Sequence, residues 1–152
     1  MPPQLASPAV VTALSDRLRL DAPLAALLAT SPEDGGPAVY LEVAPQEAPF
    51  DYLLVTAPTE TPWNTFGAAG TRKWGAEVLV YLRAVSRTSA RAAAITSRAA
   101  AVLDDPDLAF FVPGFDTAVV AFESAGPGYP EEVRGAVVHH YPAVFRVTVH
   151  GS

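Results

Sequence analysis

The sequence predicts an α+β domain with two helices packed on one face of a mainly antiparallel sheet, mixed pairing being allowed, of about four to five strands. Apolar residues recur every three to four positions in two segments, as on the buried side of a helix, and alternate with other residues in the strand segments. The segments follow in the order α-β-β-β-α-β-β, which favours helices covering one side of a sheet. The chain has 152 residues, the size of one domain, so residues 1–152 are treated as a single domain.

The first helix is predicted to have Ser7 as its N-cap and Pro8 as its first helical residue. Proline is tolerated there because the N–H that it lacks would have no partner in the first turn. The buried side of this helix is predicted to be Val10, Val11, Leu14 and Leu18. A second, short turn is expected to start at residues 21–23 and to carry Leu24, Leu27 and Leu28.

The second helix is predicted to be capped by Ser86 or Thr88 and to run to about Leu103, where an Asp-Asp-Pro sequence stops it. Its buried side is mostly small, so it can lie close to a neighbouring element: Ala92, Ile95, Ala99 and Val102. Three arginines follow the flank of this side, either as a solvated edge or as subunit contacts: Arg87, Arg91 and Arg98.

Five segments are predicted to be strands, at residues 38–43, 52–56, 73–85, 117–124 and 137–149. Residues 57–72, between the second and third strands, are predicted to form a loop or a long protruding hairpin. Residues 125–136 are predicted to be a turn-rich loop. Pro142 lacks an N–H and is therefore expected at an edge or a bulge.

The strand at 73–85 shows the clearest alternation. One face is predicted to be core, with Trp74, Ala76, Val78, Val80 and Leu82. The other face is only half polar, because it carries Leu79 and Tyr81 beside charged residues. We therefore expect this second face to be covered as well.

The composition is unusually apolar for a soluble monomer. Hydrophobic residues make up 50% of the chain and charged residues 17%, which excludes a disordered chain. We expect another molecule to cover part of this surface. No apolar run approaches the roughly 18 residues that a membrane span needs, and the first ten residues do not have the pattern of a secretory signal. No membrane partner is expected.

The charges are unevenly distributed along the chain, and the net charge is −6. Residues 1–52 carry two Arg against seven acidic residues, 53–103 carry six basic against two acidic residues, and 104–152 carry two Arg against seven acidic residues. A basic middle between acidic ends can pair within the fold or between neighbouring subunits. The net negative charge disfavours sequence-independent nucleic-acid binding, which needs Lys and Arg against phosphates.

The residue types that carry catalysis do not form a recognisable constellation. The chain has no cysteine and thus no disulfide, thiolate metal site or catalytic thiol. His139 and His140 are adjacent on a strand and point to opposite faces, while His140 and His150 are about 33 Å apart along an extended strand, so no metal site is expected. The pairs 104–105 and 131–132 are acidic residues next to prolines and are expected to be solvated.

Nucleotide-binding and nucleophile motifs are not found either. The Gly-Ala-Ala-Gly sequence at 67–70 is predicted to be a flexible loop tip. It precedes a strand and not a helix, so it is no phosphate-binding loop. No cofactor is expected.

The segment 57–72 contains large aromatic residues. Trp63, Asn64 and Phe66 lie within it, and Arg72 and Lys73 follow at its end. Large aromatic side chains on a protruding polar segment are typical anchors for a partner protein. The alternative is that Trp63 or Phe66 folds back onto the domain's own core.

Four local stretches follow one another in a characteristic order and spacing: LAALL at 24–28; APFDYLLV at 48–55 with TETPWNT at 59–65; VLVYLRAVSR at 78–87 leading into 94–95 and 101–103; and AVFRV at 143–147. In this order the chain resembles the tail-completion or tail-terminator proteins of long-tailed bacteriophages. The likeness covers about residues 8–149. The sequence departs from the family pattern at 67–70 and 106–116.

The resemblance implies a non-enzymatic structural protein of the virion, located in the tail or neck and assembled in the host cytoplasm. Proteins of this family form a hexameric ring that caps the tail tube, stops its polymerisation and offers the surface for joining the head. The implied partners are further copies of the chain, the tail tube protein and a head completion or connector protein, with DNA passing through the lumen without specific binding. The residues expected to contact the tail tube or lumen are Trp63, Asn64, Phe66, Arg72 and Lys73. The residues expected at the subunit contact are Glu77, Leu79, Tyr81, Arg83, Arg87, Arg91 and Arg98.

Two alternatives stay open. One is a head-side connector protein of the neck, with a similar size and ring habit. The other is a small enzyme or ligand-binding α+β domain whose site is built from Tyr, His and Asp residues distant in the sequence. A deep, closed pocket with strongly perturbed titratable groups would favour the latter.

Overall fold

The computed structural model describes residues 5–66, 72–105 and 110–151, and in these ranges it has three helices and one sheet of six strands. In chain order the elements are α1 (Ser7–Arg19), α2 (Ala22–Leu27), β1 (Val39–Leu41), β2 (Tyr52–Phe66), β3 (Arg72–Ser86), α3 (Ser89–Leu103), β4 (Thr117–Ala125), β5 (Tyr129–Val133) and β6 (Ala136–Gly151). The strand order is β1-β2-β3-β6-β4, and β5 pairs with β6 next to β4. β1 runs parallel to β2, while the other pairs are antiparallel, so the sheet is mixed.

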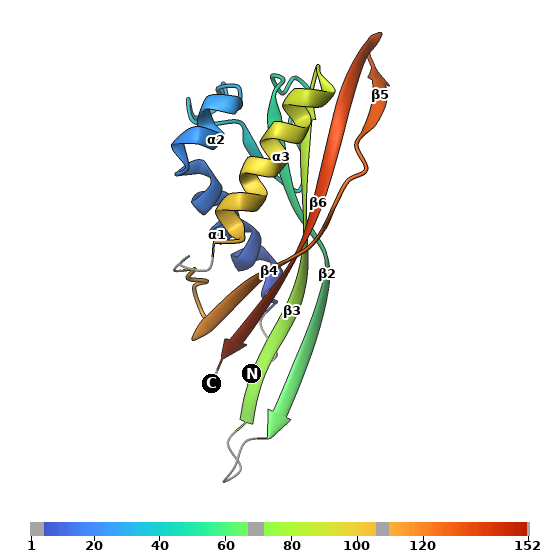
Figure 1. Ribbon diagram of the computed structural model, residues 1–152. Helices are drawn as coiled ribbons and strands as arrows, with labels where there is room; N and C mark the ends of the chain where they lie inside the picture. The colour runs from blue at the N-terminus through green and yellow to red at the C-terminus, as the bar shows by residue number, and fades with distance from the viewer. Residues whose placement is uncertain (1–4, 67–71, 106–109, 152) are drawn as a thin grey trace.

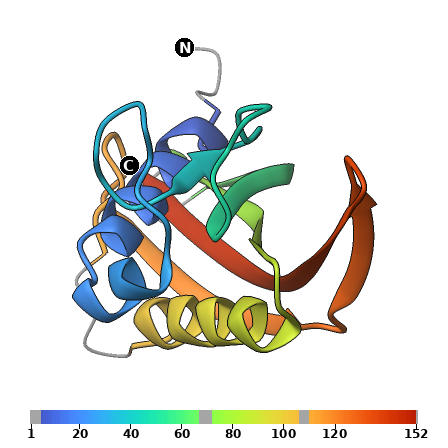
Figure 2. The ribbon, with the colours of Figure 1, turned by 90° about the horizontal axis from the view of Figure 1, so that it is seen from above.

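All three helices lie on one side of the sheet (Figure 1). The predicted α+β class with helices on one face is confirmed. The predicted count and order of elements are wrong in detail, because α2 is a helix of its own and β5 is an additional strand. The β2–β3 hairpin extends past the helices at one end of the molecule, the lower end in Figure 1. The β5–β6 hairpin stands away from them at the upper end (Figures 1 and 2).

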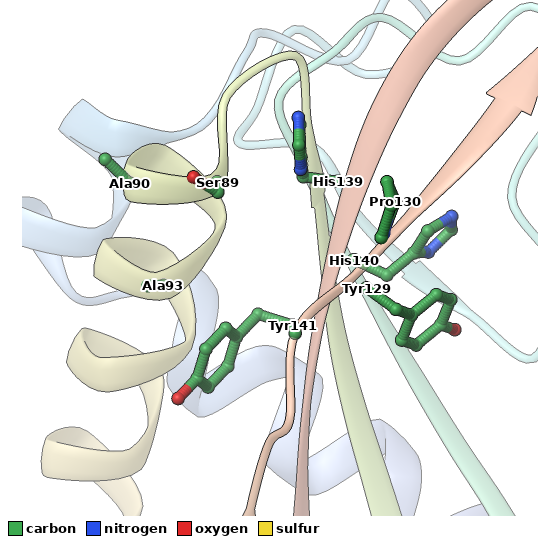
Figure 3. A pocket seen from close by; sticks show the side chains of 9 residues that line it. Ser89, Ala90, Ala93, Tyr129, Pro130, His139, His140 and Tyr141 are labelled. Carbon is green, nitrogen blue, oxygen red and sulfur yellow. The ribbon is translucent and has the colours of Figure 1, made fainter.

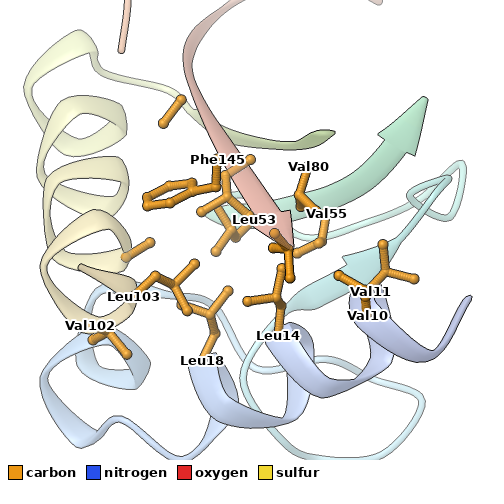
Figure 4. Packing of buried hydrophobic residues seen from close by; sticks show 14 of the residues in the cluster. Val10, Val11, Leu14, Leu18, Leu53, Val55, Val80, Val102, Leu103 and Phe145 are labelled. Carbon is orange, nitrogen blue, oxygen red and sulfur yellow. The ribbon is translucent and has the colours of Figure 1, made fainter. Parts of the chain in front are cut away.

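The main core lies between the helices and the face of the sheet that they cover, hereafter the inner face. Figure 4 shows Leu14 and Leu18 of α1 and Leu103 of α3 packed near Leu53 and Phe145 of the sheet. The predicted buried sides of both helices are confirmed: Val10, Val11, Leu14 and Leu18 in α1, and Ala92, Ile95, Ala99 and Val102 in α3. On β3 the predicted core positions from Ala76 to Leu82 are buried on the inner face.

The start of α1 differs from the prediction by one residue. Ser7 is the first residue of the helix, and Ala6 is the N-cap without a side-chain bond. Glu60 of β2 takes over the capping role, because its carboxylate accepts the N–H groups of Ala6 (2.8 Å) and Ser7 (2.9 Å) and the hydroxyl of Ser7. A carboxylate at this position also opposes the positive end of the helix dipole. The start of α3 is as predicted, since the Thr88 side chain accepts the N–H of Arg91.

The strand predicted at 52–56 continues to Phe66, so the long protruding hairpin is confirmed and the loop alternative is wrong. The sequence did not indicate a strand here because the segment contains two prolines. Pro58 falls where the register with β3 shifts between Thr56 and Thr59, and Pro62 lies opposite Ala76. Beyond the short β1, this part of β2 is an edge, and an edge strand tolerates proline. The predicted Gly-Ala-Ala-Gly tip at 67–70 lies outside the described residues.

The segment predicted to be a loop at 125–136 contains β5, which pairs with β6 through a two-residue turn. The turn residues Arg134 and Gly135 have φ angles of 52° and 78°. Positive φ at both central residues is what a tight hairpin with strand-matching twist requires. Asn-Gly or Asp-Gly would have signalled such a turn, whereas Arg-Gly did not.

Pro142 lies in β6, an interior strand, and not at an edge or bulge as predicted. Its carbonyl oxygen accepts the N–H of Gly126 (2.8 Å), which lies between the end of β4 and the start of β5. In a strand the nitrogen and the carbonyl of one residue point to the same side. The missing N–H of Pro142 therefore faces the break between β4 and β5, where the ladder is already interrupted.

We predict that Glu60→Gln lowers the free energy of unfolding by about 1–2 kcal/mol at pH 7, because α1 loses a charged cap. Burial alone would raise the pKa of Glu60, but the bonds from Ala6 and Ser7 outweigh it and hold the pKa below its usual value of 4.5. This contribution is therefore present above pH 4.5 and is lost as the pH falls through the lower value in the folded state. Urea unfolding at pH 7 and at acidic pH measures both effects.

The matched control is Glu47→Gln, an exposed carboxyl in the segment between β1 and β2. It should leave the stability within about 0.5 kcal/mol of the parent protein. An equal loss for both variants at pH 7, or a Glu60→Gln loss that does not shrink in acid, would contradict the capping role.

Candidate interaction surface

The face of the sheet that points away from the helices, hereafter the outer face, is built from alternate residues of β2, β3, β6 and β4. Strand alternation places four predicted subunit-contact residues of β3 together on it: Glu77, Leu79, Tyr81 and Arg83. The β6 residues directly opposite them are Thr148, Arg146, Val144 and Pro142. This part of the predicted contact set is therefore one continuous surface.

Arg146 lies between carboxylates of the two neighbouring strands. Its Nη1 is 2.6 Å from Oε1 of Glu77 on β3, and its Nε is 2.6 Å from Oε1 of Glu123 on β4. Exposed ion pairs of this kind contribute little to stability. They do hold the guanidinium between two negative groups, so this section of the face carries no excess of positive charge.

Among the residues that the structure describes, the chain covers the outer face at its upper end. There, Tyr40 and Leu54 are buried beneath Ala44 and Ala48 of the segment that joins β1 to β2. Farther down, Tyr81 is 43% exposed and Val119 of β4 is 59% exposed. The expected covering of this face is thus met within one chain at the upper end, while the lower part is open.

The arginines predicted on the flank of α3 have partners within the chain. The guanidinium of Arg98 forms two hydrogen bonds of 2.8 Å with the carboxylate of Asp21, the N-cap of α2. This bond holds the pKa of Asp21 below its usual range. Sequence alone did not indicate this pair, because the two residues are 77 positions apart.

Arg91 and Arg87 contact the segment before β2. Nε of Arg91 is 3.2 Å from the carbonyl oxygen of Leu27 and 3.3 Å from Oδ2 of Asp51. The guanidinium of Arg87 lies 5.7 Å from the centre of the Phe50 ring. Arg91 and Arg98 therefore pair the basic middle of the chain with its acidic first third, which is the intramolecular one of the two predicted pairings.

The β2–β3 hairpin holds the residues predicted to meet the tail tube or lumen. Trp63 lies in β2 opposite Gly75, and its ring contacts His150 of β6 edge-on at a centroid distance of 5.0 Å. Trp63 is half-buried on the outer face of its own sheet and belongs to neither cluster of core residues, so the alternative that it folds back onto the core is wrong for Trp63. The backbones of the other four residues lie at the ends of the two strands, Asn64 and Phe66 in β2 and Arg72 and Lys73 in β3.

His140, considered above only as a possible metal ligand, is a buried titratable group at the upper end of the outer face. Its side chain is only 6% exposed, its Nε2 is 2.6 Å from Oε2 of Glu131 on β5, and its ring stacks on Tyr129 at 4.8 Å. Burial lowers the pKa of His140 and nearby Arg83 lowers it further, while Glu131 acts in the opposite direction. The neutral form is therefore favoured, and the His140–Glu131 contact holds β5 against β6.

An apolar groove lies between the first turns of α3 and the β5–β6 hairpin, with a volume of about 330 Å³. Figure 3 shows Tyr141 and His139 on the side of α3, and Tyr129 and His140 on the other side of the strand. The groove is lined mostly by apolar atoms: Ser89, Ala90, Ala93, Gly128, Tyr129, Pro130, His139, His140 and Tyr141. This groove is a further surface, besides the protruding hairpins, that a partner can contact.

Metal-binding and membrane-spanning features were sought in the same ranges. Among the residues that the structure describes, no three His, Asp or Glu side chains are grouped so that they could hold a metal ion. No helix in this part of the chain is long and apolar enough to cross a bilayer.

Comparison with known proteins finds the same fold among solved structures. No family model and no curated protein sequence matches the chain. Among solved structures, a chain from the virion of a native gene transfer agent particle has the same fold, with a TM-score of 0.69 and 23% sequence identity. The likeness covers 98% of this chain and 100% of that chain. The fold is therefore shared over the whole length of both chains.

We predict that Gly75→Ala destabilises the protein by about 1–3 kcal/mol, because the close contact of Trp63 leaves no room for a side chain. An added Cβ would lie 2.3 Å from Cζ2 of Trp63 and 2.4 Å from the carbonyl oxygen of Val149. Urea unfolding followed by tryptophan fluorescence measures the loss and reports the displacement of Trp63.

Gly36→Ala is the matched control, because its added Cβ would come no closer than 3.4 Å to another atom. The Val149 carbonyl belongs to the backbone and cannot move aside when Trp63 is removed. The double variant Trp63→Ala/Gly75→Ala should therefore remain less stable than the single variant Trp63→Ala. Equal stability of these two would show that Trp63 is the sole obstacle.

We predict that the stability of the parent protein falls between pH 6.5 and 5, and that His140→Gln reduces this fall. The folded state lowers the pKa of His140 from 6.5, so the unfolded state binds more protons below that pH and acid favours unfolding. Urea unfolding across this pH range is the measurement, and His139→Gln, on the opposite face of β6, is the control. Identical pH dependence of His140→Gln and the parent would contradict the assignment.

Proposed function

We propose that this chain is a structural, non-enzymatic subunit of a phage-like particle, and that it forms the ring that ends the tail tube and receives the head. The observation that carries the proposal is the fold shared from end to end with a chain of the gene transfer agent virion. Because the likeness spans both chains, the similarity is one of whole subunits. It does not come from a local motif that many folds share. A fold does not by itself determine a function, so the surfaces must supply the second argument.

The open part of the outer face supports contact with a second subunit. β4 lies beside β6 only over residues 143–150 of β6, which face residues 75–82 of β3, so the four strands together present roughly 26 Å by 19 Å, or about 500 Å². A standard protein interface buries about 800 Å² on each partner, so this open part supplies more than half of such an interface. The residues that we assign to this contact are Glu77, Leu79, Tyr81 and Arg83.

A ring of identical subunits needs two different, complementary patches on each subunit. The outer face is the first, and the groove beside α3, on the opposite side of the sheet, supplies the second. Arg87, Arg91 and Arg98 lie on the helical side and already contact groups of their own chain. We therefore leave these three out of the proposed contact.

The lower end of the β2–β3 hairpin supports contact with a tail tube protein. β6 ends at Gly151 opposite Trp74, so in the described part of the sheet Arg72 and Lys73 of β3 have only β2 as a neighbour, and the hairpin is two-stranded there. A two-stranded ribbon is marginally stable in water by itself. We propose that the tail tube covers this end, where Arg72 and Lys73 begin β3, and that the head completion or connector protein meets the ring elsewhere. The net charge of −6 favours passage of DNA through the lumen without binding.

We predict that the purified protein is a ring with a central hole, and that Tyr81→Glu converts it to monomers. A new carboxylate on an apolar contact would have to be desolvated on association, which costs several-fold to over a hundredfold in affinity. Native mass spectrometry and negative-stain electron microscopy measure the two forms. Ala94→Glu, an exposed site on α3, is the control that should keep the ring.

A protein that stays monomeric at all concentrations, or an assembly without a hole, would contradict the ring. The terminator role has its own test, which uses tail tube protein from the same particle. Adding this protein should stop the growth of polymerising tubes and leave it at their ends. If it leaves the tubes unaffected and binds the head completion protein alone, the head-side connector role replaces the terminator role.

A further inference from the structure

The free edges of the sheet differ in how they are protected. β1 is three residues long and follows Pro37, which bridges to the preceding segment. The free part of β2 contains Pro58 and Pro62, and β5 contains Pro130 followed by two glutamates. Prolines, charged side chains and short length are the means by which natural sheets prevent the addition of another strand.

β4 lacks this protection. It has nine residues with no proline or lysine and one acidic residue, Glu123. It pairs with β6 on one side, and no backbone group of the described residues pairs with its other side. Val119 is 59% and Phe122 is 44% exposed. A long apolar edge with free backbone groups is a site at which another strand can add.

The hydrogen bond of Gly126 identifies one donor on this edge. The N–H of Gly126 points to β6, where it donates to Pro142. Successive N–H groups of a strand point to alternate sides, so the N–H of Ala125, the last residue of β4, points to the free edge. A proline at position 125 therefore removes a donor from the free edge and leaves the ladder with β6 intact.

We propose that the free edge of β4 binds an extended segment of a different protein as an additional strand. A head-to-tail contact between copies would pair β4 of one copy with β1, β2 or β5 of the next. The free edges of these three strands are protected, so such a contact is disfavoured. Pairing of β4 with β4 of a second copy would be two-fold and would close a pair, not a ring. This inference concerns the edge of the sheet and does not depend on the proposed ring contact.

The charges near β4 indicate the chemistry of the added segment. Asp116 is exposed directly before the strand, and Glu123 lies within it. The one arginine nearby, Arg146, is already placed between Glu77 and Glu123. Phe122 lies on the inner face opposite Phe145, whereas Glu123 contacts Arg146 on the outer face. The segment that fits this edge has apolar side chains on the inner face, beside Phe122, alternating with basic side chains on the outer face, beside Glu123.

The test uses a defined probe, a fluorescein-labelled decapeptide of alternating valine and lysine with blocked ends. We expect the parent protein to bind it and Ala125→Pro and Val119→Lys each to weaken binding at least tenfold. Thr59→Lys adds the same charge to the protected edge of β2 and should leave binding unchanged. The same peptide with alternate residues N-methylated keeps its charge, loses donors and should not bind. Amide exchange in β4 should slow at least tenfold when the parent protein is saturated with the peptide.

Three results would each overturn the proposal. The parent protein does not bind the peptide, Ala125→Pro and Val119→Lys bind it as tightly as the parent, or the amides that the peptide protects lie outside β4. A dimer in sedimentation that Ala125→Pro abolishes would also overturn it, because a second copy would then occupy the edge. Should Ala125→Pro fail to fold by circular dichroism, Val119→Lys against Thr59→Lys carries the test, since both substitutions are at exposed positions.

Discussion

The whole architecture depends on a difference in length between strands and helices. β2 and β3 have 15 residues each and β6 has 16, so each spans about 50 Å at 3.3 Å per residue. α1 has 13 residues and α3 has 15, which gives only about 20 Å at 1.5 Å per residue. One layer of such helices can cover only the middle of the sheet. The strands must therefore extend past the helices, as they do at both ends of the molecule (Figure 1).

The two faces of the sheet meet this constraint differently. The inner face is closed by helices whose polar flanks are fixed to the rest of the chain, α1 through Glu60 and α3 through Arg91 and Arg98. The outer face is closed by the chain at its upper end and left open below, with its charges balanced around Arg146. Two of the six basic residues in the middle of the sequence, Arg91 and Arg98, thus hold α3 against the rest of the chain. Exposed apolar side chains lie on the open face, at Tyr81 and Val119, and at Tyr129 beside the groove, but also elsewhere, as at Leu20 and Phe111.

Sequence patterns predicted the elements whose burial is set locally. α1, α3 and β3 were correctly predicted because one buried side imposes a period of 3.6 or 2 on the sequence. The patterns failed where a partner strand decides the structure, as in the lower half of β2 with Pro62, in β5, and at Pro142. The outer-face residues Leu79 and Tyr81 were predictable, since they interrupt an expected polar face. Arg146 with its two carboxylates was not, because its contacts require the registers of three strands that are distant in the sequence.

The central place of β6 in the sheet has a consequence for the order in which the sheet can form. β6 is the last strand in chain order, yet it alone joins β3 to both β4 and β5. During synthesis the β2–β3 hairpin can pair as soon as it leaves the ribosome, whereas β4 and β5 have no neighbouring strand in the described sheet until β6 follows. The free edge of β3 therefore stays open through the synthesis of α3, β4 and β5. The last strand to emerge completes all three remaining ladders, so the sheet forms its long-range pairs together and not one after another.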